Sequence, residues 1–222
     1  GAKIWYLALT GNLLHAGAWF TRGGFVWYGG FLGAVAAILL NGRRKGIPGR
    51  FTAELCAAPL ALGYAVGRVG CFLVGDDYGT PSSLPWGLKF PQGLPPSTVA
   101  ELTNAGVAFP PGTDALQVGA VHPTQLYETL LMLLAFLWLW GRRAHGHATG
   151  WLWGWYLVFA GAERFLIEFV RAKDDRLLGG FTLAQATSVG LVLVGAYLVQ
   201  RWREPVPGEV ATPAALRPTK KT

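Results

Sequence analysis

Six apolar runs, separated by polar segments, set the pattern of the chain. They cover residues 4–14, 25–40, 51–70, 124–140, 151–170 and 183–199. A helix needs about 20 mainly apolar residues to cross the hydrocarbon core of a bilayer. The last five runs approach this length, and the first reaches it if it continues to about Phe20. The pattern predicts an all-α polytopic membrane protein with about six transmembrane helices.

Residues 71–121 interrupt this pattern. They contain seven prolines and many Gly, Ser and Thr residues, which favour turns and loops. We expect one transmembrane helical domain over residues 1–200, in which 71–121 form a long irregular loop outside the membrane. The polar tail, residues 201–222, combines several prolines with mixed charge and is expected to be disordered.

Composition agrees with a membrane protein. Hydrophobic residues make up 52% of the 222 positions, charged residues 14%, and the mean hydropathy is +0.34, more apolar than ordinary soluble domains. The net charge of +7 would also suit a nucleic-acid binder, but such a protein gathers its Lys and Arg on one surface. Here the bases stand between apolar runs, so we expect the lipid bilayer, and no nucleic acid, as a partner.

The two cysteines do not form a disulfide framework. Cys56 and Cys71 are fifteen positions apart on one predicted helix, about 22 Å at the helical rise, which exceeds disulfide reach. The chain begins with Gly1 instead of Met, so we expect a fragment or a processed chain.

The distribution of bases predicts the orientation. Residues 41–50, residues 141–149 and the C-terminal tail are rich in Arg and Lys, whereas 71–121 contains one base, Lys89, against four acids. Because positive loops stay in the cytoplasm, the C-terminus is expected there and the long loop outside.

Three polar groups at the outward ends of predicted spans are candidates for chemistry. Arg68 ends an apolar run and is followed by Asp76; an arginine at membrane depth needs a partner or a polar cavity. Gln125 and Glu128 share one helical face next to His122, and Arg164, Glu168 and Arg171 recur at i, i+4 and i+7.

Each group also has a structural explanation. Pro123 and Glu128 suit the start of a helix, and the late arginines could form an internal ion-pair ladder. Glu54 is interpreted as structural, pairing with loop arginines, and the glycines that flank Tyr28 could serve packing alone. The functional alternative is a pocket of arginines for a phosphate group, since guanidinium groups bind phosphate through two parallel hydrogen bonds. An anion reached from lipid is most naturally a phospholipid headgroup.

The chain resembles the prolipoprotein diacylglyceryl transferases, integral inner-membrane enzymes of bacteria. Their motif His-Pro-[Ser/Thr]-Gln-Leu-Tyr-Glu is matched in full at 122–128, and their Arg-x-x-x-Glu-x-x-Arg at 164–171. The aromatic-Gly-Gly element aligns with 25–30, and an acid before the signature with Glu54. The signature Gly-Arg-x-Gly-Asn-Phe-x-Asn-Gly-Glu-x-x-Gly is matched by Gly67, Arg68, Gly70, Phe72, Gly75 and Gly79.

The resemblance indicates a variant branch. Tyr28 replaces the family's usual histidine, Cys71 and Val74 replace two asparagines, and Asp76 replaces the signature glutamate. The family's first transmembrane span is expected to be missing.

The resemblance implies transfer of the diacylglyceryl group of phosphatidylglycerol to the lipobox cysteine thiol of a prolipoprotein signal peptide. A thioether forms and glycerol phosphate leaves, at a site that opens to the periplasmic side of the inner membrane, and no cofactor or metal is expected. The expected catalytic residues are Arg68, Arg164, His122, Asp76, Glu128 and Tyr28. The expected phosphatidylglycerol-binding residues are Arg68, Arg164, Arg171, Glu168, Gln125, Gly29 and Gly30.

The residue roles follow from the chemistry. Arg68 and Arg164 would bind the phosphate and stabilise the departing charge. His122, Asp76 or Glu128 would take the thiol proton, whereas Tyr28, a neutral phenol, would donate a hydrogen bond to the phosphate. Two other functions remain open: a non-catalytic phospholipid-binding subunit derived from this family, and an anion channel or transporter, which lacks the support of an inverted repeat.

Overall fold

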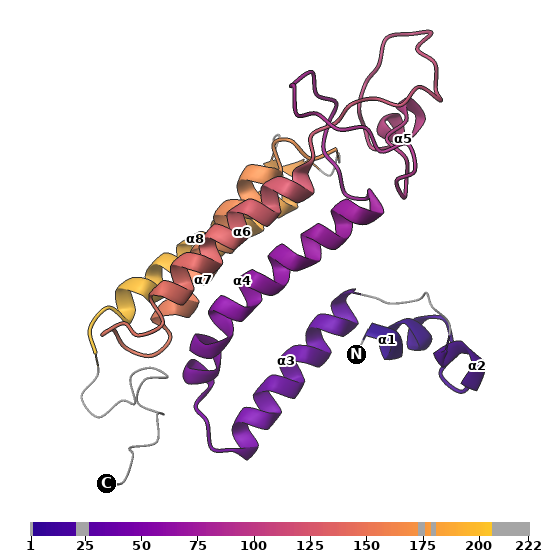
Figure 1. The fold of residues 1–222 in the computed structure, drawn as a ribbon. Coiled ribbons are helices and arrows are strands. Elements are labelled where there is room, and N and C mark those ends of the chain that lie inside the picture. The colour runs from indigo at the N-terminus through magenta and orange to yellow at the C-terminus, as the bar shows by residue number, and fades with distance from the viewer. Residues whose placement is uncertain (1, 21–26, 173–175, 179–180, 206–222) are drawn as a thin grey trace. The chain divides into compact units, whose positions relative to one another are not determined.

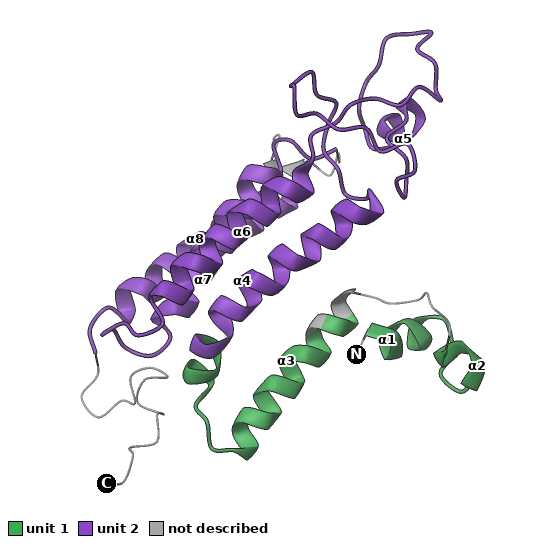
Figure 2. Ribbon diagram, viewed as in Figure 1, with its two compact units in different colours: residues 1–53 green, residues 54–222 purple. Residues whose placement is uncertain are grey.

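The computed structural model describes residues 2–20, 27–172, 176–178 and 181–205, and it is predominantly helical (Figure 1). The chain divides into two compact units, residues 1–53 and 54–222 (Figure 2). Helix α4, Gly49–Val74, begins in the first unit and continues through the second. The expected single domain over residues 1–200 stays a prediction.

The first unit contains α1 (Ala2–Leu9), α2 (Ala16–Trp19) and α3 (Trp27–Arg44). The first apolar run could reach the length of a span only by continuing to about Phe20, and it does not continue as one helix. Gly11 adopts a left-handed φ of +69°, and the Asn12 N–H bonds back to the Leu7 carbonyl, so that α1 ends after two turns. At eight residues, α1 is too short to cross a bilayer by itself.

The second unit packs α4 against α6 (Thr124–Gly141) and α7 (Trp151–Ile167). Small side chains of α4, including Ala57 and Ala61, face Met132 and Leu139 of α6 in this core. Helix α8 (Leu183–Arg201) packs along α7, with Gly154 and Gly195 at the contact. A Cβ added to Gly195 would lie 2.6 Å from the Gly154 carbonyl oxygen, so the two backbones approach as closely as small residues allow.

The positions of α3, α4, α6, α7 and α8 agree with the last five apolar runs. Two helices in the described part of the chain, α4 and α8, are long and apolar enough to cross a membrane. Exposed Leu residues recur on α6 at positions 126, 130, 134 and 137, a face suited to lipid. The structure is therefore consistent with a helical membrane protein, and the number of spans stays a prediction.

The segment between α4 and α6 is irregular, as expected, but it has a core of its own. It contains α5 (Val99–Asn104) and isolated bridges that join Val121 to Pro81 and to Leu88. Tyr78, Leu102 and Val121 form a small buried cluster. A short antiparallel pair, β1 (Arg176–Leu178) and β2 (Phe181–Thr182), precedes α8 and was not expected from the sequence.

Candidate functional site

The site begins where α4 ends. The Gly75 N–H bonds the Phe72 carbonyl and the Asp76 N–H bonds the Cys71 carbonyl, with Gly75 at φ +73°, which is the glycine-closed helix end known as a Schellman motif. Asp77 follows at φ +53°, the one non-glycine residue with positive φ among those described. This turn directs the chain back across the end of α6.

Arg68 lies one and a half turns before this helix end and joins two acids from different segments. Its Nε forms an ion pair with Glu128 Oε2 of α6, and its Nη1 donates to Asp77 Oδ2 at 3.1 Å. The Arg68 side chain is 13% exposed and the Glu128 side chain 4%. The arginine that the sequence indicated is therefore paired across helices at the end of the bundle.

The start of α6 is fastened to the same turn. Gln125 Nε2 donates to the Asp76 carbonyl at 2.5 Å, and Thr124 Oγ1 donates to the Asp77 carbonyl at 2.7 Å. Both side chains are buried. Gln125 and Glu128 thus share the face predicted for them, and Glu128 faces Arg68 instead of serving only as a helix-start residue.

The late arginine motif divides into two ion pairs. Arg164 Nη2 pairs with Glu168 Oε2 at 2.5 Å, whereas Arg171 Nη2 pairs with Asp77 Oδ1 at 3.3 Å. Helix α7 ends at Ile167, three residues earlier than the apolar run. The expected ladder therefore holds for Arg164 and Glu168 only, because Arg171 leaves the helix and its backbone bridges to Gly79.

Gly79 allows this close crossing of segments. A Cβ at this position would lie 2.3 Å from the Val170 carbonyl oxygen and 2.8 Å from Thr124 Cγ2. The Gly79 N–H donates to the His122 carbonyl at 2.8 Å. The last glycine of the signature therefore has a steric reason to be glycine.

Tyr64 and Glu163 belong to the site and were missed from the sequence. Tyr64 precedes Arg68 by one turn of α4 and interacts electrostatically with Glu163, Glu128, Arg68 and Arg164. A side-chain hydrogen bond links it to Glu163, which is buried at 6% exposure. The i, i+4 spacing of Tyr64 and Arg68 was the available signal. Tyr64 is thus within electrostatic range of both arginines expected to bind phosphate.

Four buried polar atoms of the cluster have neither a hydrogen-bond partner nor an ion pair in the described part of the chain. One is the donor Arg164 Nη1, and three are the acceptors Asp76 Oδ1, Gln125 Oε1 and Glu163 Oε1. Buried polar groups are otherwise nearly always satisfied. A donor and three acceptors are thus available for a further molecule.

His122 lies to one side of this cluster. Its Nδ1 is 3.3 Å from the Tyr127 hydroxyl, which also accepts a hydrogen bond from Trp86 Nε1 at 2.8 Å. Among the described contacts, the His122 side chain meets Tyr127 and not the arginines. Its expected role as a base stays a prediction.

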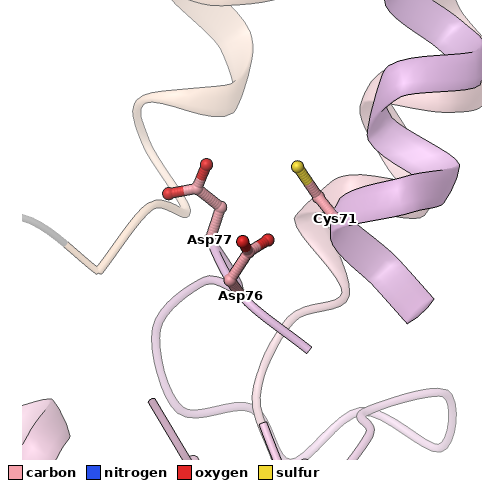
Figure 3. A group of neighbouring side chains, drawn as sticks. All are labelled: Cys71, Asp76 and Asp77. Atoms are coloured by element: carbon pink, nitrogen blue, oxygen red, sulfur yellow. The ribbon is translucent and has the colours of Figure 1, made fainter. Parts of the chain in front are cut away.

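Cys71 Sγ and the carboxylates of Asp76 and Asp77 surround one small space (Figure 3), with their ligand atoms within 4.8 Å of one another. Such a set could hold a cation. However, Arg68 Nη1 already contacts Cys71 Sγ at 3.3 Å and Asp77 Oδ2 at 3.1 Å. The guanidinium supplies the positive charge here, and the arrangement suits an arginine-centred anion site better than a metal site.

The pKa values of two loop residues, Asp77 and Tyr78, reflect the electrostatic environment of the site. Burial acts to raise the pKa of Asp77, but the hydrogen bond to Arg68 and the charges of Arg171 and Arg68 outweigh it and hold that pKa below its usual value. Burial, followed by the charge of Glu101, raises the pKa of Tyr78, whose hydroxyl donates to the Pro96 carbonyl at 2.8 Å. Asp77 is therefore an anion and Tyr78 a neutral donor at neutral pH.

Tyr28, Gly29 and Gly30 lie in the first unit. Gly30 packs close to Ala2, with its added Cβ 3.4 Å from the Ala2 Cβ, which favours the packing interpretation for that glycine. The expected contacts of these three residues with a lipid stay predictions. Glu54, interpreted as structural, is buried and bonded to His145 and to two backbone N–H groups.

Comparisons with known proteins agree with the motifs. A family model described as prolipoprotein diacylglyceryl transferase matches residues 1–201. The chain is similar to proteins named phosphatidylglycerol–prolipoprotein diacylglyceryl transferase. That of Nitratidesulfovibrio vulgaris (strain DP4) is 33% identical over 184 residues, 81% of this chain and 61% of the relative.

Two further relatives carry the same name. That of Cereibacter sphaeroides (strain ATCC 17029 / ATH 2.4.9) is 32% identical over 201 residues, covering 82% of this chain and 64% of the relative. That of Bordetella parapertussis (strain 12822 / ATCC BAA-587 / NCTC 13253) is 34% identical over 182 residues, covering 80% and 61%. The chain therefore spans about three fifths of the length of the curated relatives it matches.

Proposed function

The chain belongs to the prolipoprotein diacylglyceryl transferase family, and on this premise we propose that it transfers the diacylglyceryl group of phosphatidylglycerol to the lipobox cysteine of a prolipoprotein. The observation that carries the proposal is the arginine cluster: Tyr64 is within electrostatic range of Arg68 and Arg164, and Arg164 keeps a buried N–H without a hydrogen-bond partner among the described residues. The enzyme would work in the bacterial inner membrane, with the cluster open to the periplasmic side.

The arginines suit the phosphate that leaves. In the reaction the thiol sulfur forms a bond to the glyceryl carbon, the carbon–oxygen bond to phosphate breaks, and glycerol phosphate departs with both electrons of that bond. Negative charge therefore develops on the phosphate oxygen. Arg68 and Arg164 are held by buried acids, so their positive charge is already oriented where this charge appears, which is the most effective form of electrostatic catalysis.

Asp76 is the first choice for the group that takes the thiol proton. Its Oδ1 is buried without a hydrogen-bond partner among the described residues. Glu128 is paired with Arg68, Asp77 with two arginines, and Glu163 is hydrogen-bonded to Tyr64. A thiol near its ordinary pKa of about 8.5 needs only a modest base. The proton would then pass to the phosphate that leaves, so that proton and charge balance.

Gln125 and Glu168 would act by positioning. Gln125 fixes the Asp76 backbone through its 2.5 Å hydrogen bond, and Glu168 fixes one edge of the Arg164 guanidinium. Gln125 thereby leaves the Asp76 carboxylate directed toward the cluster, and Glu168 leaves the other edge of the Arg164 guanidinium directed there. Their substitution is expected to lower the transfer rate less than substitution of the arginines.

A transfer assay with the full-length natural protein tests the proposal. Purified protein, phosphatidylglycerol vesicles and a lipobox peptide are incubated, and the thioether product is measured by mass. We expect product from the wild type and at least about a hundredfold loss of rate in Arg68→Gln and Arg164→Gln, the scale for losing one preorganised charge contact. Arg143→Gln, which removes a surface arginine elsewhere, should keep the wild-type rate.

Two results would count against the proposal. Binding of phosphatidylglycerol without any thioether would identify a phospholipid-binding subunit instead of an enzyme. An Arg68→Gln protein with undiminished transfer would remove the cluster from the chemistry.

A further inference from the structure

A cavity lies at the other end of the helix bundle from the arginine cluster, beside the start of α7. Its volume is about 450 Å³, and its walls come from the α6–α7 loop, α7 and the end of α8. Trp151 and Arg164 are 13 positions apart on α7, about 20 Å along the helix. The cavity is therefore separate from the arginine cluster described above.

The polar groups of this cavity include several donors. Trp155 Nε1 is buried without a hydrogen-bond partner among the described residues, and an indole N–H can only donate. Arg203 has an exposed side chain and forms none of the ion pairs seen in the described part of the chain. Gln200 adds an amide. No carboxylate is among the described residues that line the cavity, so its donors favour an anion.

His147 holds the mouth of the cavity in shape. Its Nδ1 donates to the Arg203 carbonyl at 2.6 Å, and its ring stacks on Trp151 with centroids 4.2 Å apart. The Arg203 backbone is thereby tied to the loop that precedes α7. The guanidinium extends from a fixed point beside two tryptophan rings.

The remaining walls are apolar. Val158 of α7 and Ala196 and Val199 of α8 line the cavity below the donors. Around it, the same end of the unit exposes the basic side chains of Arg142 and Arg201. A charged mouth above an apolar groove fits a phospholipid better than a free ion, and basic pockets between membrane helices commonly bind anionic headgroups. Tryptophan at this level is typical of the lipid–water interface.

We infer that this cavity binds one anionic phospholipid, with its phosphate at Arg203 and Trp155 and an acyl chain against Val158 and Val199. The site differs from the proposed transfer site in place and in partners. It does not depend on the proposed function, because it would hold a lipid whether or not the chain is a transferase.

Native mass spectrometry of the full-length protein in mild detergent tests the site. An Arg164→Gln background weakens the other expected anion site, so that the adduct with added phosphatidylglycerol reports this cavity. In that background, Arg203→Gln should weaken phosphatidylglycerol binding about tenfold, the scale for one charge-assisted contact. Gln200→Glu, which places a carboxylate at the mouth, should weaken it at least as much.

The matched control is Arg143→Gln, which removes the same charge from a residue outside the cavity wall and should leave binding unchanged. Equal loss in Arg143→Gln would show a general charge effect and overturn the site. Equal binding of phosphatidylcholine, or complete displacement of the lipid by millimolar inorganic phosphate, would overturn the assignment to an anionic phospholipid. With Arg164 intact, Arg203→Gln should still form thioether at the wild-type rate, so failure of this site and failure of the proposed function are distinguishable.

Discussion

Glu54 offers a sharp test of what holds the helices together. Its side chain is 1% exposed and accepts three hydrogen bonds. His145 Nε2 lies 2.5 Å from Oε1, and the N–H groups of Gly150 and Leu152 lie 2.8 and 3.1 Å from Oε2. The His147 N–H donates to His145 Nδ1, so the His145 proton sits on Nε2 and points at the carboxylate. One carboxylate of α4 therefore accepts hydrogen bonds both from the loop before α7 and from the first turn of α7.

Glu54→Ala leaves these three donors buried without an acceptor. Removing one partner of a buried charged network destabilises a protein by about 3–5 kcal/mol, in line with about 1–3 kcal/mol for each unsatisfied buried group. For a chain of this size 1 kcal/mol corresponds to about 2–4 °C in Tm, so the expected loss is about 6–20 °C. Glu54→Gln keeps one acceptor oxygen and should lose roughly half as much.

Thermal unfolding in detergent, followed by tryptophan fluorescence, measures this loss, because Trp151 packs against the His145 ring. Glu204→Gln, an exposed acid near the same loop, is the control and should change Tm by less than about 2 °C. Below its Tm, the Glu54→Gln protein should transfer diacylglyceryl at the wild-type rate, because Arg68 lies 14 positions further along α4, about 21 Å away. A Glu54→Ala protein with the same Tm as the wild type would refute the reasoning.

Three further outcomes are expected. Gly79→Ala should destabilise the protein by about 1–3 kcal/mol and stop transfer, because the added Cβ would lie 2.3 Å from a backbone oxygen. Gly141→Ala, which has open space around it, is the control and should change neither the Tm nor the transfer rate. Gly161→Ala should lower Tm by several degrees because its Cβ would lie 2.7 Å from an α8 carbonyl, and Gly190→Ala, which meets nothing within 4 Å, should not. The pKa of Asp77 is lower in the folded protein than in the unfolded chain. The ionised Asp77 carboxylate therefore contributes to folding stability at every pH above its unfolded pKa of about 3.9. This contribution is lost as the pH falls through the lower folded pKa. The Tm difference between wild type and Asp77→Asn should therefore be constant from pH 5 to 7 and shrink below about pH 4; a difference that grew on acidification would contradict the two arginine contacts.

The sequence predicted the helices of the second unit well because apolar periodicity and helix length both act locally. It left open whether residues 4–20 form one helix, and the structure answers this, since a left-handed glycine, Gly11, lies between Thr10 and Asn12 just after the end of α1. It also placed the end of α7 three residues late. Arg171 leaves the helix to meet Asp77, a contact between residues 94 positions apart, and local patterns carry no information about such a partner.

The site was predictable to the level of its residues but not of its pairings. Arg68 and Glu128 were both singled out because charges are rare at membrane depth, and the structure pairs them. Asp77 was assigned no role of its own, since an acid in a loop is ordinary until the fold sets it between two arginines. Glu163 sits beside Arg164 in the chain, yet it points to Tyr64 on another helix, and only the packing of α4 against α7 reveals this.

The exposures of the acids indicate which contact a phosphate would replace. Glu128 and Glu168 are 4% and 2% exposed. Removing Glu168 would take away the ion-pair partner of Arg164, and removing Glu128 would leave Arg68 with Asp77 alone, so both losses are unfavourable. Asp77 is 45% exposed and bridges Arg68 and Arg171 at 3.1 and 3.3 Å. A phosphate that arrives from the lipid can take over these two contacts while Asp77 turns to solvent, because an exposed carboxylate loses little on leaving an ion pair. On binding, the phosphate would thus replace the Asp77 carboxylate at these two contacts, with the buried acids holding Arg68 and Arg164 in place throughout.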